Sequence, residues 1–217
     1  MSGWNFSAII VGPRGFGKTT LQISLIERHL RETNGIVIAH DPVMQFAKHG
    51  CRYYPDVHAF REANAAAARE GKTVPRGSAI GGLDSEAVTK CALDMGEKMN
   101  TADRVACPIL VPYDEASLRD GSGSTHIGDL DRQMLSLARH RGVGPVFNLQ
   151  EAKQLVAQFF RQATDVYLFR QTEDRARELD NLLVLEKHTL VRAGVTRLEK
   201  HDYLHVRTGE GIVGDPL

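Results

Sequence analysis

The sequence predicts an α/β fold in which a mostly parallel central sheet is flanked by helices. Apolar runs of strand length alternate with helical stretches along most of the 217 residues, and this alternation is typical of parallel strands joined by crossover helices. The clearest case comes first, where residues 6–11 are largely apolar, residues 12–19 are rich in glycine and residues 20–27 have a helical pattern. No repeat or low-complexity linker interrupts the series, so we expect a single domain over residues 1–217.

Each further element is predicted from its local pattern. The first helix is expected over residues 18–32, where leucines recur at helical spacing, and Asn34-Gly35 ends it. In chain order we then expect a strand at 35–39, short extended pieces at 53–55 and 78–80, an Ala-rich helix at 63–69, a helix at 85–99 capped by Asp84, strands at 109–113, 142–150, 165–170 and 202–207, and helices at 128–140, 151–163 and 173–185.

The composition is that of an ordinary globular protein, with 42% apolar and 25% charged residues. Lysine plus arginine equals aspartate plus glutamate, 27 against 27, so the chain cannot coat a nucleic acid through its overall field. Any contact with a polyanion needs a local patch or a ring that gathers small patches around an axis. The widely spaced Cys51, Cys91 and Cys107 indicate reduced thiols. We find no signal peptide or membrane span and expect a soluble, intracellular protein.

Residues 12–19 match the phosphate-binding pattern G-x-x-x-x-G-K-T. Glycines let the backbone turn its N–H groups toward an anion, and a helix start favours negative charge. Lys18 is then placed to reach the β- and γ-phosphates, and the Thr19 hydroxyl to hold Mg²⁺. The pattern predicts binding of ATP with Mg²⁺, and the alternative is an ordinary glycine-rich turn. The predicted nucleotide-binding residues are Gly12, Pro13, Arg14, Gly15, Phe16, Gly17, Lys18, Thr19 and Thr20.

Two carboxylates follow the apolar strand at 109–113 and predict the second half of a nucleotide hydrolase site. Asp114 is expected to hold Mg²⁺ opposite Thr19, and Glu115 to accept a proton from the attacking water. Open α/β sheets bind ligands at the carboxyl ends of their strands, where both motifs fall. The alternative is an ordinary acidic turn. Pro112 lies inside this strand, where it removes a ladder hydrogen bond, so we expect a bulge or one-sided pairing there.

Other polar residues at strand and helix ends allow two interpretations each. The Gln150 amide can bind both water and a γ-phosphate oxygen, or it is a satisfied group at a strand end. Asp41 either caps the next turn or touches the water shell of the metal. Arg139, Arg141 and Arg170 either stabilise the ends of their elements or serve as arginine fingers on the transferred phosphoryl group.

The order of these parts resembles the HerA/FtsK superfamily of DNA-pumping P-loop ATPases over most of the chain. The resemblance rests on the phosphate loop, Asp41-Pro42, Asp114-Glu115, residues 139–144 leading to Gln150, and Phe169-Arg170-Gln171-Thr172. It implies that Gln150 is the family's strand-four sensor. It also implies that Arg139, eleven residues earlier, reaches into the neighbouring subunit's site, and that Arg170 is a second catalytic arginine. Pro112 and Asn148-Leu149 depart from the family's pattern.

A motor of this size without extra domains is similar to the genome-packaging ATPases of tailless, internal-membrane phages and archaeal viruses. The resemblance implies an ATP-dependent translocase that pumps a viral genome into a capsid. It also implies a homo-oligomeric ring, a hexamer, around double-stranded DNA. Viral vertex or membrane proteins would be further partners, and the location would be the host cytoplasm or the packaging vertex. The alternatives are a conjugation or secretion ATPase of the same superfamily, and a nucleotide-dependent assembly switch that moves nothing.

The basic residues that could contact DNA do not form a motif as specific as that of the phosphate loop. Arg119 and Lys153 are candidates for the pore of such a ring. A cluster that comprises Lys187, His188, Arg192, Arg197 and Lys200 could bind DNA or a partner, although interleaved acidic residues favour a solvated surface of mixed charge.

Overall fold

The computed structural model describes residues 6–101, 104–114, 129–155, 157–183, 191–207 and 211–213. The chain divides into two compact units. Of the described residues, the first unit contains 23–101, 104–114 and 129–145, and the second unit contains the others. Helix α1 (Lys18–Glu32) and strand β6 (Val143–Leu149) each begin in one unit and end in the other. The predicted single domain stays a prediction.

The second unit contains the strand that precedes the phosphate loop. Strand β1 (Ala8–Val11) pairs in parallel with β6 on one side and with β7 (Asp165–Phe169) on the other. Strands β8 (Tyr203–Arg207) and β9 (Gly211–Ile212) continue this sheet in antiparallel pairing, in the order β6-β1-β7-β8-β9. All residues of β1 and β7 are buried. Near-continuous apolar runs of this kind are expected of strands covered on both faces.

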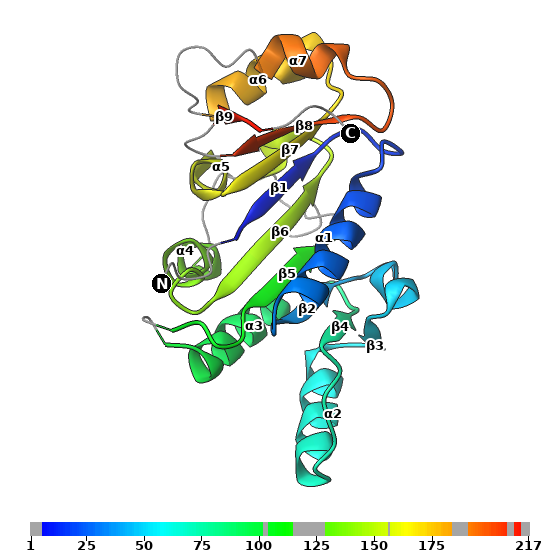
Figure 1. Cartoon of the computed structure of the whole chain (residues 1–217), viewed down its shortest axis with the longest axis vertical. Helices are drawn as coiled ribbons and strands as arrows, with labels where there is room; N and C mark the ends of the chain where they lie inside the picture. The colour runs from blue at the N-terminus through cyan, green and yellow to red at the C-terminus, as the bar shows by residue number, and fades with distance from the viewer. Residues whose placement is uncertain are drawn as a thin grey trace. The chain divides into compact units, whose positions relative to one another are not determined.

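Short helices accompany these strands in the second unit. A 3₁₀ turn (Ala152–Gln154) and α5 (Ala157–Gln162) connect β6 to β7. Helix α6 (Glu173–Leu182) packs on α7 (Val191–Arg197), and α7 packs on β8, as Figure 1 shows. The buried Ala176, Leu179 and Val195 supply the apolar side of this helix pair.

The first unit contains four parallel strands in the order β3-β4-β2-β5. These are β2 (Ile36–His40), β3 (Arg52–Tyr54), β4 (Gly77–Ile80) and β5 (Ile109–Tyr113). Helix α3 (Ser85–Met99) packs against β2, β5 and α4 (Asp129–Leu137), and α2 (Val57–Arg69) contacts α3 and β3. Asp56 and Asp84 cap α2 and α3 by accepting backbone hydrogen bonds from Ala59 and Ala87, each at 2.8 Å.

Pro112 is accommodated in β5 without a bulge on the side of β2. The pairs Ile36–Ile109, Val37–Leu110 and His40–Tyr113 keep one constant offset, so no extra residue is inserted. The pairing is interrupted only between them, at Val111 and Pro112. Pro112 therefore interrupts the pairing of β5 with β2 locally. The end of β5, and Asp114 after it, stay in register with β2.

The predicted α/β fold with a mostly parallel sheet flanked by helices is confirmed, and most elements lie within a few residues of their expected bounds. The expected helix at 151–163 was wrong in part, since it divides into the 3₁₀ turn and α5. Helix α7, strand β9 and a 3₁₀ turn at Phe46–His49 were not expected. None of the helices in the described part of the chain is long and apolar enough to span a membrane.

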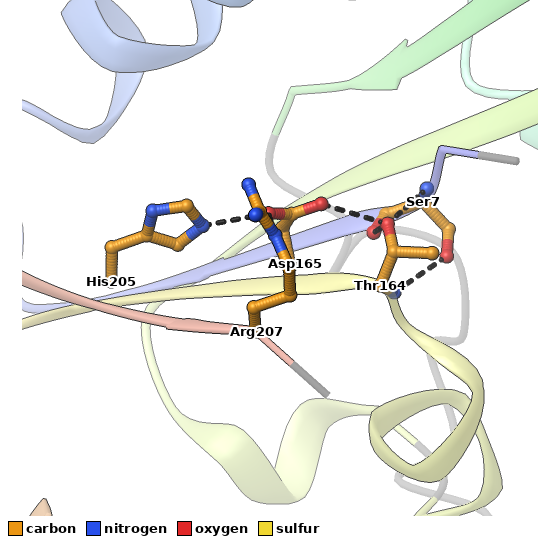
Figure 2. Close-up of polar contacts among 5 residues, drawn as sticks. All are labelled: Ser7, Thr164, Asp165, His205 and Arg207. Carbon is orange, nitrogen blue, oxygen red and sulfur yellow. Dashed lines mark hydrogen bonds and ion pairs between the residues drawn. The ribbon is translucent and has the colours of Figure 1, made fainter. Parts of the chain in front are cut away.

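A polar network joins the start of β7 to the end of β8 in the second unit (Figure 2). Asp165 Oδ1 accepts from His205 Nε2 at 2.7 Å and from Arg207 Nε at 3.4 Å. Its Oδ2 accepts from the Thr164 hydroxyl at 2.8 Å, and Thr164 and Ser7 exchange further hydrogen bonds. Burial raises the pKa of Asp165, but these hydrogen bonds and the nearby positive charges outweigh burial, so the pKa lies below its ordinary value.

The three cysteines are free thiols, as predicted. Cys51 and Cys91 are buried and Cys107 is half-buried. Burial, followed by the negative charge of Asp41, raises the pKa of the Cys51 thiol to about 11. Burial also raises the pKa of Cys91 and Cys107 above their ordinary values. All three therefore stay protonated at neutral pH.

Candidate nucleotide-binding site

The loop between β1 and α1 has the backbone conformation that its glycines allow. Gly15 and Gly17 have φ angles of 81° and 97°, in the left-handed region that other residues rarely adopt. Gly17 O accepts the hydrogen bond from Leu21 N at 3.0 Å, so α1 begins directly after Gly17. The first turn of a helix has backbone N–H groups without intrahelical partners, and its dipole favours negative charge. The loop therefore ends where an anion is best stabilised.

Gly12 is closely packed between two strands. Its N–H donates to Leu149 O of β6 at 3.1 Å. A methyl group built on its α-carbon would lie 2.6 Å from Phe169 Cβ of β7, which is shorter than any normal contact. Glycine is required here because β7 approaches the loop too closely for a side chain.

Lys18 lies over the loop that precedes it. Its side chain is 8% exposed, and Nζ donates to Pro13 O at 3.0 Å. The ammonium group and the start of α1 thus place positive charge at one end of the loop. Thr19 and Phe16 are half-buried, whereas Arg14 and Thr20 are exposed. The left-handed glycines and this lysine fit the polyphosphate of a nucleotide.

Gln150 and Arg170 lie level with the beginning of the loop. Val11 is paired with Leu149 on one side and with Leu168 on the other. Gln150 follows β6 directly, and Arg170 follows β7. Both predicted residues thus stand at the carboxyl end of the strands that flank β1, where ligands bind in such sheets. Gln150 is half-buried and Arg170 is exposed.

A capped turn fixes the backbone after Gln150. The Gln154 side chain accepts from the backbone N–H of Gln150 and of Glu151, both at 2.8 Å. Glu151 forms ion pairs with Arg175 and, at 2.8 Å, with Lys153. The hydrogen bond from Lys153 is the main cause that holds the pKa of Glu151 below its ordinary value, and Arg175 adds to it. Lys153, a candidate for the pore of a ring, is therefore engaged in an ion pair beside Gln150.

A buried amide pair lies behind the loop and was not singled out from the sequence. Gln22, one turn into α1, is 0% exposed, and its Nε2 donates to Val146 O at 3.2 Å. Asn148 Nδ2 donates to Gln22 Oε1 at 3.4 Å. These hydrogen bonds connect the helix after the phosphate loop with β6, the strand that precedes Gln150. The departure from the family's pattern at Asn148 thus has a structural role.

The acidic candidates Asp41 and Asp114 of the first unit lie at the carboxyl ends of β2 and β5. Asp114 is 2% exposed, and its backbone N–H donates to His40 O at 3.1 Å. Asp41, also buried, accepts backbone hydrogen bonds from Gln45 at 2.7 Å and from Phe46 at 2.8 Å, one on each carboxylate oxygen. Of the two interpretations of Asp41, the structure supports the capping of the next turn.

The two arginines after α4 differ in their surroundings. Arg141 pairs with Glu97 at 2.8 Å and is half-buried, so it stabilises its own unit. Arg139 is exposed, as a side chain that reaches another subunit must be. Its role in trans stays a prediction.

Several predicted positions lie outside the described residues. These are Glu115, Arg119, Lys187 and His188. Of the remaining basic cluster, Arg192 forms an ion pair with Glu173, whereas Arg197 and Lys200 are exposed. Phe169 and His201, whose side chains lie close to Gly12 and Gly17 of the phosphate loop, were not predicted as site residues. Nothing in their local sequence signals a contact made across the sheet.

The fold of this chain is shared with proteins of known structure. The structure is similar to the genome packaging NTPase B204 from Sulfolobus turreted icosahedral virus 2 in complex with AMPPCP, with a TM-score of 0.72 and 16% identity over 98% of this chain and 97% of that chain. B204 in complex with ATP-gammaS gives a TM-score of 0.73 at 15% identity over 98% of each chain. No protein-family model and no curated protein sequence matches this chain.

A second similarity is to a secretion protein. The cytoplasmic domain of the type VII secretion ATPase EccC from Thermomonospora curvata gives a TM-score of 0.55 at 13% identity, over 96% of this chain and 23% of that chain. This chain thus spans less than a quarter of that domain. The chain has the fold of the packaging and secretion P-loop ATPases, and the resemblance drawn from its motifs is confirmed at the level of the fold.

Proposed function

We propose that this chain is a P-loop ATPase that uses ATP hydrolysis to move double-stranded DNA, as in the packaging of a viral genome into a capsid. The observation that carries the proposal is the phosphate loop, with its left-handed Gly15 and Gly17 and with Lys18 over it. Gln150 and Arg170 at the ends of the flanking strands support it, as does the fold shared with B204.

Each of the candidate site residues would have a separate task at the nucleotide. Lys18 and the loop N–H groups bind the β- and γ-phosphates. Thr19 and Asp114 would hold Mg²⁺, which when bound offsets the negative charge of the phosphates. Glu115 takes the proton of the attacking water, and the Gln150 amide orients that water against the γ-phosphate. These groups are the ones that phosphoryl transfer to water requires.

Arg139 acts on the site of a neighbouring subunit. Its guanidinium is exposed, and a guanidinium can stabilise the charge that develops on the transferred phosphoryl group. Hydrolysis then depends on contact between subunits. The subunits of a ring can therefore hydrolyse ATP one after another around the DNA. The proposal locates the protein in the host cytoplasm or at a packaging vertex, with vertex or membrane proteins as further partners.

The test measures ATPase rate together with oligomeric state. Turnover is recorded with no DNA, with duplex DNA and with single-stranded DNA, while light scattering reports the assembly. We expect duplex DNA to stimulate turnover several-fold and to stabilise a ring. Stimulation by single strands alone would support a conjugation-type ATPase instead. If DNA changed neither the rate of turnover nor the oligomeric state, the proposed translocase would be contradicted and an assembly switch would be supported.

A further inference from the structure

His201 has a backbone conformation that a residue with a side chain rarely adopts. Its φ angle is 78°, and it lies in the turn that joins α7 to β8. In the described part of the chain, Met44 with a φ of 58° is the only other non-glycine residue of this kind. Such conformations cost free energy and persist where the surrounding structure enforces them, often at functional sites.

The imidazole of His201 lies against the phosphate loop. A methyl group built on the α-carbon of Gly17 would lie 3.3 Å from His201 Nδ1 and 3.6 Å from Phe169 Cε1. Gly17 is the last residue of the loop before Lys18, within the same unit. In Figure 1 the turn between α7 and β8 reaches the loop between β1 and α1, in agreement with this contact. The turn between α7 and β8 therefore lies beside the loop at Gly17.

The His201 imidazole has the chemistry to bind an anion. Gly17 belongs to the stretch whose N–H groups would bind a phosphate, and the ring lies close to this same residue. His201 is exposed, and among the described residues its ring nitrogens are not engaged in a hydrogen bond. An imidazole can donate a hydrogen bond from either nitrogen, and as a cation it adds positive charge.

We propose that His201 is a nucleotide-contacting residue, whose imidazole donates a hydrogen bond to the polyphosphate of the nucleotide held by the loop. This inference rests on the proposed nucleotide binding and adds a contact from a turn about 180 residues further along the chain. The left-handed backbone at His201 serves to direct the ring toward Gly17.

The test uses His201→Gly, which removes the ring and also relieves the backbone conformation. Binding of ATP, ADP and inorganic tripolyphosphate is measured by calorimetry, with thermal unfolding in parallel. We expect ATP and tripolyphosphate to bind about tenfold more weakly, the effect of losing one hydrogen bond to a charged group. Thermal stability should stay equal or rise. His201→Asn, which tolerates the left-handed region and keeps a donor, should recover part of the affinity.

Met44→Gly is the matched control, because it relieves the same kind of backbone conformation in the other unit. Its affinity for ATP should equal that of the wild type. If His201→Gly bound tripolyphosphate normally, the assignment of the ring to the phosphates would be overturned, even if ATP bound more weakly. Failure of the wild-type chain to bind ATP would contradict the proposed function itself, whereas tight binding by both the wild type and His201→Gly would overturn this inference alone.

Discussion

At the scale of single residues, the proposed binding of a nucleotide depends most on Lys18. Lys18→Ala removes the ammonium group beside the loop, and with it the proposed hydrogen bonds to the β- and γ-phosphates. We expect ATP to bind about 10- to 100-fold more weakly, because hydrogen bonds to charged groups contribute about 1.5–3 kcal/mol. Calorimetric titration measures this. Lys72, an exposed lysine paired with Glu70, provides the control, and Lys72→Ala should leave ATP affinity unchanged.

Gly12 tests the packing of the loop against β7. Gly12→Ala places a methyl group 2.6 Å from Phe169 Cβ, and the overpacking should destabilise the protein by about 1–3 kcal/mol. Denaturant unfolding measures the loss. Gly194→Ala in α7 is the matched change, since its methyl group would meet nothing closer than 3.6 Å. It should stabilise by about 0.4–1 kcal/mol, and equal losses in the two variants would contradict the packing argument.

Much of the candidate site was predictable residue by residue, because its residues are consecutive or end a strand. The phosphate loop follows from its pattern, and Asp114, Gln150 and Arg170 follow from the rule that ligands bind at carboxyl ends of strands. The tertiary contacts were not predictable. The packing of Phe169 on Gly12 and of His201 on Gly17 joins segments about 160 and 180 residues apart, and no local periodicity encodes it.

At the scale of elements, Asp165 connects β7 to β8 and makes their pairing dependent on pH. Its pKa is lowered in the folded state from 3.8, so its stabilising contribution is fully present above about pH 4. The contribution is lost as the pH falls below that value, because the folded state then resists protonation more than the unfolded state. Asp165→Asn should lower the free energy of unfolding by about 1–3 kcal/mol at pH 7. The stability of this variant should also lack the part of the pH dependence that comes from Asp165. Denaturant midpoints from pH 3 to 7 measure both.

A surface carboxylate provides the control for Asp165. Asp94 pairs with Arg61 at 3.3 Å on the surface, where its side chain is 41% exposed. Such pairs contribute less than about 1 kcal/mol, so Asp94→Asn should be nearly neutral. A variant of Asp165 no more destabilised than that of Asp94 would show that the network in Figure 2 does not hold the strands together.

The elements themselves were predictable to the extent that a single pattern dominates each one. Helix α1 and strand β5 match their expected bounds because periodicity and flanking breakers agree. Helix α7 was missed because its seven residues include Gly194 and two valines, which are poor helix formers, and it is stabilised by packing on α6 and β8. Strand β9 has two residues, too few for any alternation to be recognised.

At the scale of the whole molecule, the proposed motor predicts complementation between two inactive variants. Arg139→Ala should lack the finger offered to a neighbour, and Glu115→Gln should bind ATP but not hydrolyse it. In a mixed assembly, an intact finger on a Glu115→Gln subunit can serve an intact base on an Arg139→Ala subunit. Equimolar mixtures should therefore recover about a quarter of wild-type turnover if one interface in four pairs correctly. Turnover no higher than that of either variant alone would exclude action across the interface.

The burial of two of the three cysteines has a practical consequence for studies of assembly. A maleimide reacts with thiolate, so the shielded and protonated Cys51 and Cys91 should resist it in the native protein, and Cys107 should be modified first. A fluorophore can then be attached at one known position without mutagenesis. Energy transfer between labelled copies would report whether subunits assemble in solution and whether duplex DNA changes that assembly.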